Sequence, residues 1–243
     1  GLHVYGSNNS IYQRADLLSA GTGGGGVRID GAENNLTILP GPRVYADGAD
    51  GRAVMFAYGK DHTFTHRGDA QALGERGIAV SFDFGHNSRG DATGYRGSYI
   101  LEVPNSTPEE YSAILPELEG ALVSSFDLTG RVAGRKAAIY MSENALVDRI
   151  NVMQGAQITG DIISNYLEVD GDGDLRLTNL TFGNAADENG NATSAADSDF
   201  ALTYDGNITG KNLSLQINGG NTTLTGDHLL YNATIAQAGT LSG

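Results

Sequence analysis

Three aspartates, Asp170, Asp172 and Asp174, alternate with glycines at a spacing that is typical of the start of a calcium-binding loop. A helix–loop–helix calcium loop places Gly at its sixth position and Glu at its twelfth. Those positions hold Leu175 and Thr181, which excludes that form of site. Two interpretations remain: a weak surface calcium site on the three aspartates, or an acidic turn that binds no cation.

Two Arg-Gly-Asp triplets form a second candidate motif. An exposed loop with this triplet can bind integrins, which recognise the Arg side chain together with a metal-bound Asp carboxylate. A chain rich in glycine and aspartate also produces such triplets by chance. The two candidate binding triplets are Arg67, Gly68 and Asp69, at a turn of the repeat described below, and Arg89, Gly90 and Asp91, which open an insertion.

His62 and His66, next to Asp61, have a four-residue spacing that suits a metal site on a helix. The segment has the alternating pattern of a strand, where side chains four residues apart lie about 13 Å from one another. One zinc ion cannot bridge that distance, so the sequence predicts turn or surface histidines with ordinary hydrogen bonds.

The composition excludes several kinds of chemistry. The chain has 243 residues and no cysteine, which rules out disulfides, cysteine zinc sites and a thiol nucleophile. Its formal net charge of −14 would repel a phosphate backbone, so nucleic acid is a poor partner. Glycoside hydrolysis needs two opposed carboxylates on one groove, but the acidic residues fall mostly at predicted turns. The sequence therefore predicts no catalytic site, and a carbohydrate-active enzyme is kept as an alternative.

A repeat of about 25 residues organises most of the chain. Short apolar–x–apolar segments end at Gly6, Gly31, Gly59 and Gly85, with spacings of 25, 28 and 26 residues. Alternation with period two means that one face of each strand is buried, and stacked copies would form one continuous core. The pattern predicts an all-β fold, a right-handed parallel β-helix, as one unit over residues 1–243.

The alignment of the copies also predicts a register. A fifth copy replaces the glycine by Ser142. With the turns aligned, Val4, Ile29, Phe56, Phe82 and Ile139 should stack in one buried column.

Two segments interrupt the repeat. Residues 88–134 lose the turn signal, and Ser106–Glu110 is typical of a helix start, with Pro in the first turn and carboxylates beside it. Apolar residues at helical spacing then predict two short helices or one kinked helix. This apolar set is either a binding or self-association surface or a cap that packs on the solenoid. It comprises Tyr111, Ile114, Leu115, Leu118 and Leu122. Residues 185–199 are small, acidic and Asn-rich, and predict an exposed loop.

Several short segments of the chain resemble the passengers of subtilisin-type serine protease autotransporters of Gram-negative bacteria. They are Tyr95–Tyr99, Phe126–Gly130, Ala137–Ser142, Ile158–Ser164, Leu180–Gly183 and Asp205–Gly210, and the N-terminal copies fit the same family. The resemblance covers nearly the whole chain, but these segments belong to the scaffold and contain no catalytic motif.

That resemblance implies a parent protein with an upstream protease, a β-helical passenger and a C-terminal membrane barrel. Only segments similar to the passenger occur in this sequence. It implies a stalk and adhesion surface at the cell surface or outside the cell, attached to the outer membrane only through a barrel missing from this chain. The implied partners are a host-cell or bacterial surface protein or glycan, or a second copy. An accessory domain of an upstream protease is a further alternative. Both ends stop within the pattern, which predicts a fragment of a longer passenger.

Overall fold

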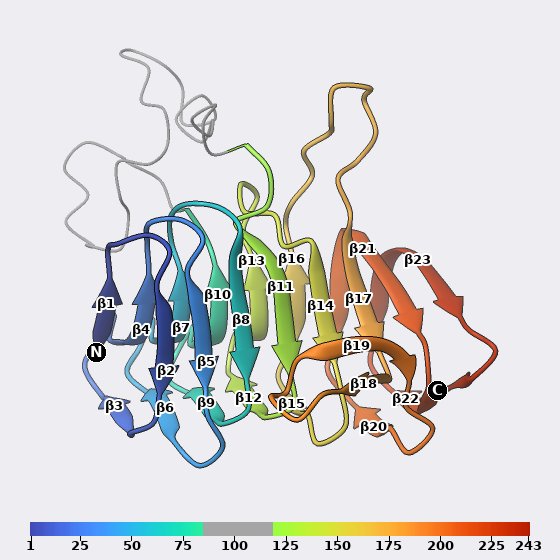
Figure 1. Ribbon diagram of the computed structural model, residues 1–243, viewed down its shortest axis with the longest axis horizontal. Coiled ribbons are helices and arrows are strands. Elements are labelled where there is room, and N and C mark those ends of the chain that lie inside the picture. The colour runs from blue at the N-terminus through green and yellow to red at the C-terminus, as the bar shows by residue number, and fades with distance from the viewer. Residues whose placement is uncertain (85–118) are drawn as a thin grey trace.

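The computed structural model describes residues 1–84 and 119–243, and these residues form stacked parallel sheets (Figure 1). The chain runs from a strand of a first face to a strand of a second and then a third, and returns one coil further along. Each strand pairs with its equivalents in the preceding and following coils, which is the strand order of a parallel β-solenoid. The expected parallel, all-β architecture is confirmed for the described residues.

The first and second faces belong to one sheet because two late strands, β21 (Ile208–Ile217) and β23 (His228–Ile235), cross from one face to the other. The first face holds β1 (Leu2–Val4), β4 (Gly25–Ile29), β7 (Arg52–Phe56), β10 (Ile78–Phe82), β13 (Ala137–Met141) and β16 (Ile162–Ser164). The second face holds β2 (Ser10–Gln13), β5 (Asn35–Ile38), β8 (His62–His66), β11 (Val123–Leu128), β14 (Arg149–Val152) and β17 (Thr178–Phe182).

The third face consists of two shorter parallel sheets. The first contains β3 (Leu17–Ser19), β6 (Arg43–Ala46), β9 (Asp69–Ala72), β12 (Arg131–Gly134) and β15 (Gln157–Thr159). The second contains β20 (Ala201–Tyr204), β22 (Gly220–Leu224) and β24 (Gly239–Ser242). An antiparallel hairpin of β18 (Asn184–Ala186) and β19 (Ala192–Ala196) lies outside these layers.

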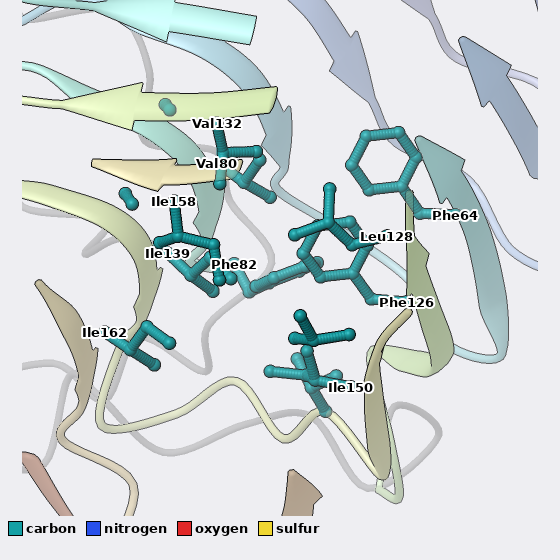
Figure 2. Packing of buried hydrophobic residues seen from close by; sticks show 14 of the residues in the cluster. Phe64, Val80, Phe82, Phe126, Leu128, Val132, Ile139, Ile150, Ile158 and Ile162 are labelled. Atoms are coloured by element: carbon teal, nitrogen blue, oxygen red, sulfur yellow. The ribbon is translucent and has the colours of Figure 1, made fainter. Parts of the chain in front are cut away.

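Inward side chains stack in columns along the solenoid axis (Figure 2). The predicted register is correct for Val4, Ile29, Phe56 and Phe82, which pair in successive coils, and all but the terminal Val4, which is partly buried, are fully buried. It is wrong for the fifth copy, because Phe82 pairs with Met141, and Ile139 pairs with Val80 in the neighbouring column. The turn after this strand differs in length, so an alignment on the turn residue shifted the register by two residues.

The turns stack as closely as the strands do. An ideal Cβ on Gly59, where φ is +100°, would lie 1.4 Å from the carbonyl oxygen of Gly31. In the same corner Asn8, Glu33 and Asp61 all have positive φ, between 54° and 58°. The amide of Asn8 donates to the next coil at Ala32, so the left-handed turns are copied from coil to coil by hydrogen bonds.

The boundary predicted for the insertion 88–134 is wrong at its C-terminal end. Val123–Leu128 and Arg131–Gly134 are the regular strands β11 and β12. Leu122, predicted on the apolar face of a helix in this insertion, instead lies fully buried in the solenoid core just before β11. The described residues contain no helix, so none of them forms one able to cross a membrane. The predicted helix from Ser106 onward falls on residues 106–118, which lie outside the described residues.

Candidate interaction surface

Negative charge is concentrated along one edge of the solenoid, which we call the acidic corner. It consists of the turns that join the first face to the second. Its described residues include eleven acidic and three basic side chains, against thirteen acidic and ten basic in the rest of the described chain. The acidic members are Asp30, Glu33, Asp61, Asp83, Glu119, Glu143, Asp148, Glu168, Asp170, Asp172 and Asp174, and the basic ones are Lys60, Arg176 and Lys211.

The acidic corner carries a projecting segment, residues 165–177, which we call the arm. It leaves the solenoid after β16, returns at β17, and extends beyond the ends of the strands (Figure 1). A bridge between Val169 and Leu175 makes it a short antiparallel hairpin. Leu167 is 54% exposed and Val169 is 52% exposed. Apolar side chains at this exposure on a projecting hairpin are what a contact surface needs.

The base of the arm is anchored to two neighbouring coils. Tyr166 packs with Ala121 and Leu146 in a small core separate from the main one. Burial, followed by the nearby carboxylate of Glu168, raises the pKa of Tyr166 to about 12. Burial also raises the pKa of Glu168, against the attraction of Arg176. The arm therefore rises from a packed base, although its tip is solvated.

The three candidate calcium ligands occupy the tip of the arm. The Oδ1 atom of Asp170 accepts hydrogen bonds from the amides of Asp172 (2.9 Å) and Asp174 (3.0 Å). These bonds close a tight turn in which Gly173 has a φ of +87°. Within the described residues, no group of three or more Asp, Glu or His side chains is arranged to hold a metal ion. The side chain of Asp170 thus has a structural role in the turn, whereas Asp172 and Asp174 contribute their backbone amides to it.

The hairpin of β18 and β19 contains a second turn of the same design. The Oδ1 atom of Asp187 accepts from the amides of Asn189 and Asn191, both at 2.9 Å, and Gly190 has a φ of +82°. Most of residues 185–199 are exposed, as the sequence predicts, but the segment forms a hairpin that contacts the second face rather than an irregular loop. Both tips have the sequence pattern Asp-x-Asx-Gly-Asx, from which two turns of the same type could have been predicted.

The first Arg-Gly-Asp triplet belongs to the framework of the solenoid. Gly68 is buried against the preceding and following coils, and Asp69 begins β9. The carboxylate of Asp69 accepts from Arg131 Nη1 at 2.6 Å and from the hydroxyl of Tyr45 at 2.5 Å. The fold thus occupies the group that an integrin-type ligand would present.

Asp69 is one step of a ladder of alternating charge on the third face. In register order the ladder runs Asp16, Arg43, Asp69 and Arg131. Arg43 donates twice to Asp16, with Nη2–Oδ2 at 2.6 Å. This ladder was not predicted from the sequence, although its members recur at one position of the repeat. The hydrogen bonds lower the pKa of Asp16 and raise that of Arg43.

His62 and His66 lie in a strand, as predicted, but the expectation of turn or surface positions is wrong because both side chains are fully buried. His62 Nδ1 accepts from the amide of Asn34, and its Nε2 donates to the carbonyl of Tyr58 at 2.8 Å. His66 Nε2 donates to the carbonyl of Arg131 at 2.8 Å, while its Nδ1 atom has no partner. Burial lowers the pKa of both, that of His66 to about 4.

The other candidate residues lie outside the described residues: Arg89, Gly90 and Asp91 of the second triplet, and Tyr111, Ile114, Leu115 and Leu118 of the predicted helix. Comparison with known proteins adds no further residue, since no protein-family profile, no curated protein and no solved structure matches this chain. The candidate surface rests on geometry and charge alone.

Proposed function

We propose that this chain is a scaffold without a catalytic site of its own, which presents the acidic corner and its arm to a binding partner. The observation that carries the proposal is the arm. The solenoid repeat does not require residues 165–177, yet they project from the most acidic edge and expose Leu167 and Val169. Excursions held out by a rigid scaffold commonly carry binding functions.

The charge of the surface favours one chemistry of partner. Three carboxylates at the tip of the arm, beside two exposed apolar side chains, suit a protein surface with an apolar patch and basic residues around it. A phosphate backbone would be repelled by the same carboxylates. We propose a surface protein of a host or bacterial cell as the partner, and a glycan or a second copy as the other outcomes of the test.

The proposal extends to location and family. Three features support an assignment to the passenger stalk of a Gram-negative autotransporter at the cell surface. They are the parallel solenoid, the absence of cysteine and the sequence segments that resemble such passengers. A right-handed coil is part of this proposal, because parallel crossovers are almost always right-handed.

Adhesion of beads coated with the protein tests this function. Wild-type beads should bind cultured epithelial cells or one another, and the two readouts separate a cell-surface partner from self-association. A variant with Leu167→Ser, Val169→Ser, Asp172→Asn and Asp174→Asn should lose most of this binding. All four side chains are exposed, so the fold should be retained.

The matched control combines Leu18→Ser on the third face, where Leu18 is 61% exposed, with Glu188→Gln at the other turn. This control should bind like the wild type. Binding that is absent from the wild type, or unchanged in the arm variant, would overturn the proposed surface. Release of products from a panel of polysaccharides would overturn its non-catalytic character.

A further inference from the structure

The hairpin of β18 and β19, which we call the strap, leaves the solenoid after β17 and crosses back over the second face (Figure 1). Its contacts reach strands from earlier coils. The amide of Ala192 donates to Asp127 Oδ2 at 2.9 Å, and Thr65 Oγ1 donates to Asn191 Oδ1 at 2.8 Å. Thr65 lies in β8 and Asp127 in β11, whereas the strap begins after β17.

The contact is closed to water. Thr65, Asp127 and Asn151 point outward from the second face, yet each is at most 8% exposed. The carboxylate of Asp127 accepts from Asn151 Nδ2 at 2.7 Å on one oxygen and from the strap on the other. A buried carboxylate that loses one of these donors would keep its desolvation cost without the compensating bond. The strap is therefore a docked element with defined partners.

We propose that the strap is a brace that makes four coils open as one cooperative unit. In a solenoid each coil contacts only its neighbours, so coils can unfold one at a time from an end. The strap adds a connection between the coil of β17 and the coils of β8 and β11, across the coil of β14. Opening any of these coils then requires the strap to lift, and the stalk keeps its stiffness over this stretch.

The two equal turns supply a matched pair of variants. Gly190 packs on the side chain of Arg67, where a Cβ would lie 2.8 Å from Cδ, whereas Gly173 in the arm has no atom within 4 Å of such a Cβ. Both glycines have positive φ. Gly190→Leu and Gly173→Leu therefore impose similar backbone strain, but only the first places a bulky side chain between the strap and the solenoid.

Native-state hydrogen exchange, followed by mass spectrometry on the full chain, measures the cooperativity. In the wild type, amides of β8, β11, β14 and β17 should exchange with one common opening rate. In Gly190→Leu the amides of all four strands should exchange roughly tenfold faster or more, as expected for the loss of two hydrogen bonds. Gly173→Leu should leave these rates unchanged.

Thr65→Val keeps the shape of the side chain and removes one strap bond, so it should accelerate the same amides by a smaller factor. This milder variant tests the brace even if Gly190→Leu does not fold. Unchanged exchange in Thr65→Val, together with unchanged or missing data for Gly190→Leu, would overturn the brace. Equal acceleration by Gly173→Leu would overturn it as well.

Discussion

Arg131 donates from Nη1 to Asp69 Oδ1 at 2.6 Å, across 62 residues of sequence and one step of the solenoid. The pair is half-buried, and Tyr45 adds a second donor to the same carboxylate. Asp16 and Arg43 form the equivalent pair nearer the N-terminus, with more exposed side chains.

Replacing Asp69 by Ala should lower the free energy of unfolding by about 1–2 kcal/mol, because two donors lose their acceptor. Replacing Asp16 should lower the free energy of unfolding by less than replacing Asp69 does, because solvent screens the more exposed pair. Urea unfolding of both variants measures the difference. A larger loss for Asp16 than for Asp69 would contradict the assignment of Asp69 to the framework.

The core columns predict the cost of single truncations. Ile29 and Ile139 are both fully buried, so each replacement by Ala should cost about 2–5 kcal/mol. The register predicts energetic coupling between Ile139 and its partner Val80, and additivity between Ile139 and Phe56, two coils away. Double-mutant cycles measure this coupling for each pair. Additive losses of stability for Ile139 and Val80 would argue against the register.

Glycine stacking in the turns predicts a position-specific loss. Gly59→Ala would place a Cβ 1.4 Å from the carbonyl oxygen of Gly31, so the coils must separate there. Gly41 also has positive φ, +107°, but no atom within 4 Å of an added Cβ. We expect more than about 3 kcal/mol for Gly59→Ala and about 1 kcal/mol for Gly41→Ala, measured by chemical denaturation.

His66 predicts a loss of stability in mild acid. Because burial lowers its pKa from 6.5 to about 4, the unfolded chain binds a proton in this range before the folded chain does. Stability from this group is complete above pH 6.5 and falls by on the order of 3 kcal/mol toward pH 4. His66→Leu, which matches Leu128 in the same column, should flatten that part of the profile. An unchanged slope between pH 6.5 and 4 would contradict this.

Calcium should not stabilise the protein. Asp170 Oδ1 is already bonded to two amides of its own turn, and the described residues hold no three-carboxylate group arranged around an ion. The melting temperature should be the same in millimolar calcium and in a chelator. A melting temperature that rises when calcium is added, by an amount that Asp172→Asn abolishes, would restore the metal interpretation of the tip.

The repeat was readable from the sequence because its physics is local. Alternating apolar residues such as Val27 and Ile29 define an inward face, and a glycine at each turn marks where coils stack. These signals predicted the parallel fold and four of five members of one core column. The Asp-Gly pattern at residues 170–174 left a turn and a weak calcium site as its two interpretations, and the turn was readable because its hydrogen bonds span only a few residues.

Tertiary structure decided the features that depend on which residues become neighbours. The length of each turn sets the register, and that is why Ile139 lies opposite Val80 rather than Phe82. The charge ladder, the acidic corner and the docking of the strap on Asp127 join residues from different coils. No local pattern encodes these contacts, because the coil rise brings together side chains separated by one or more complete repeats.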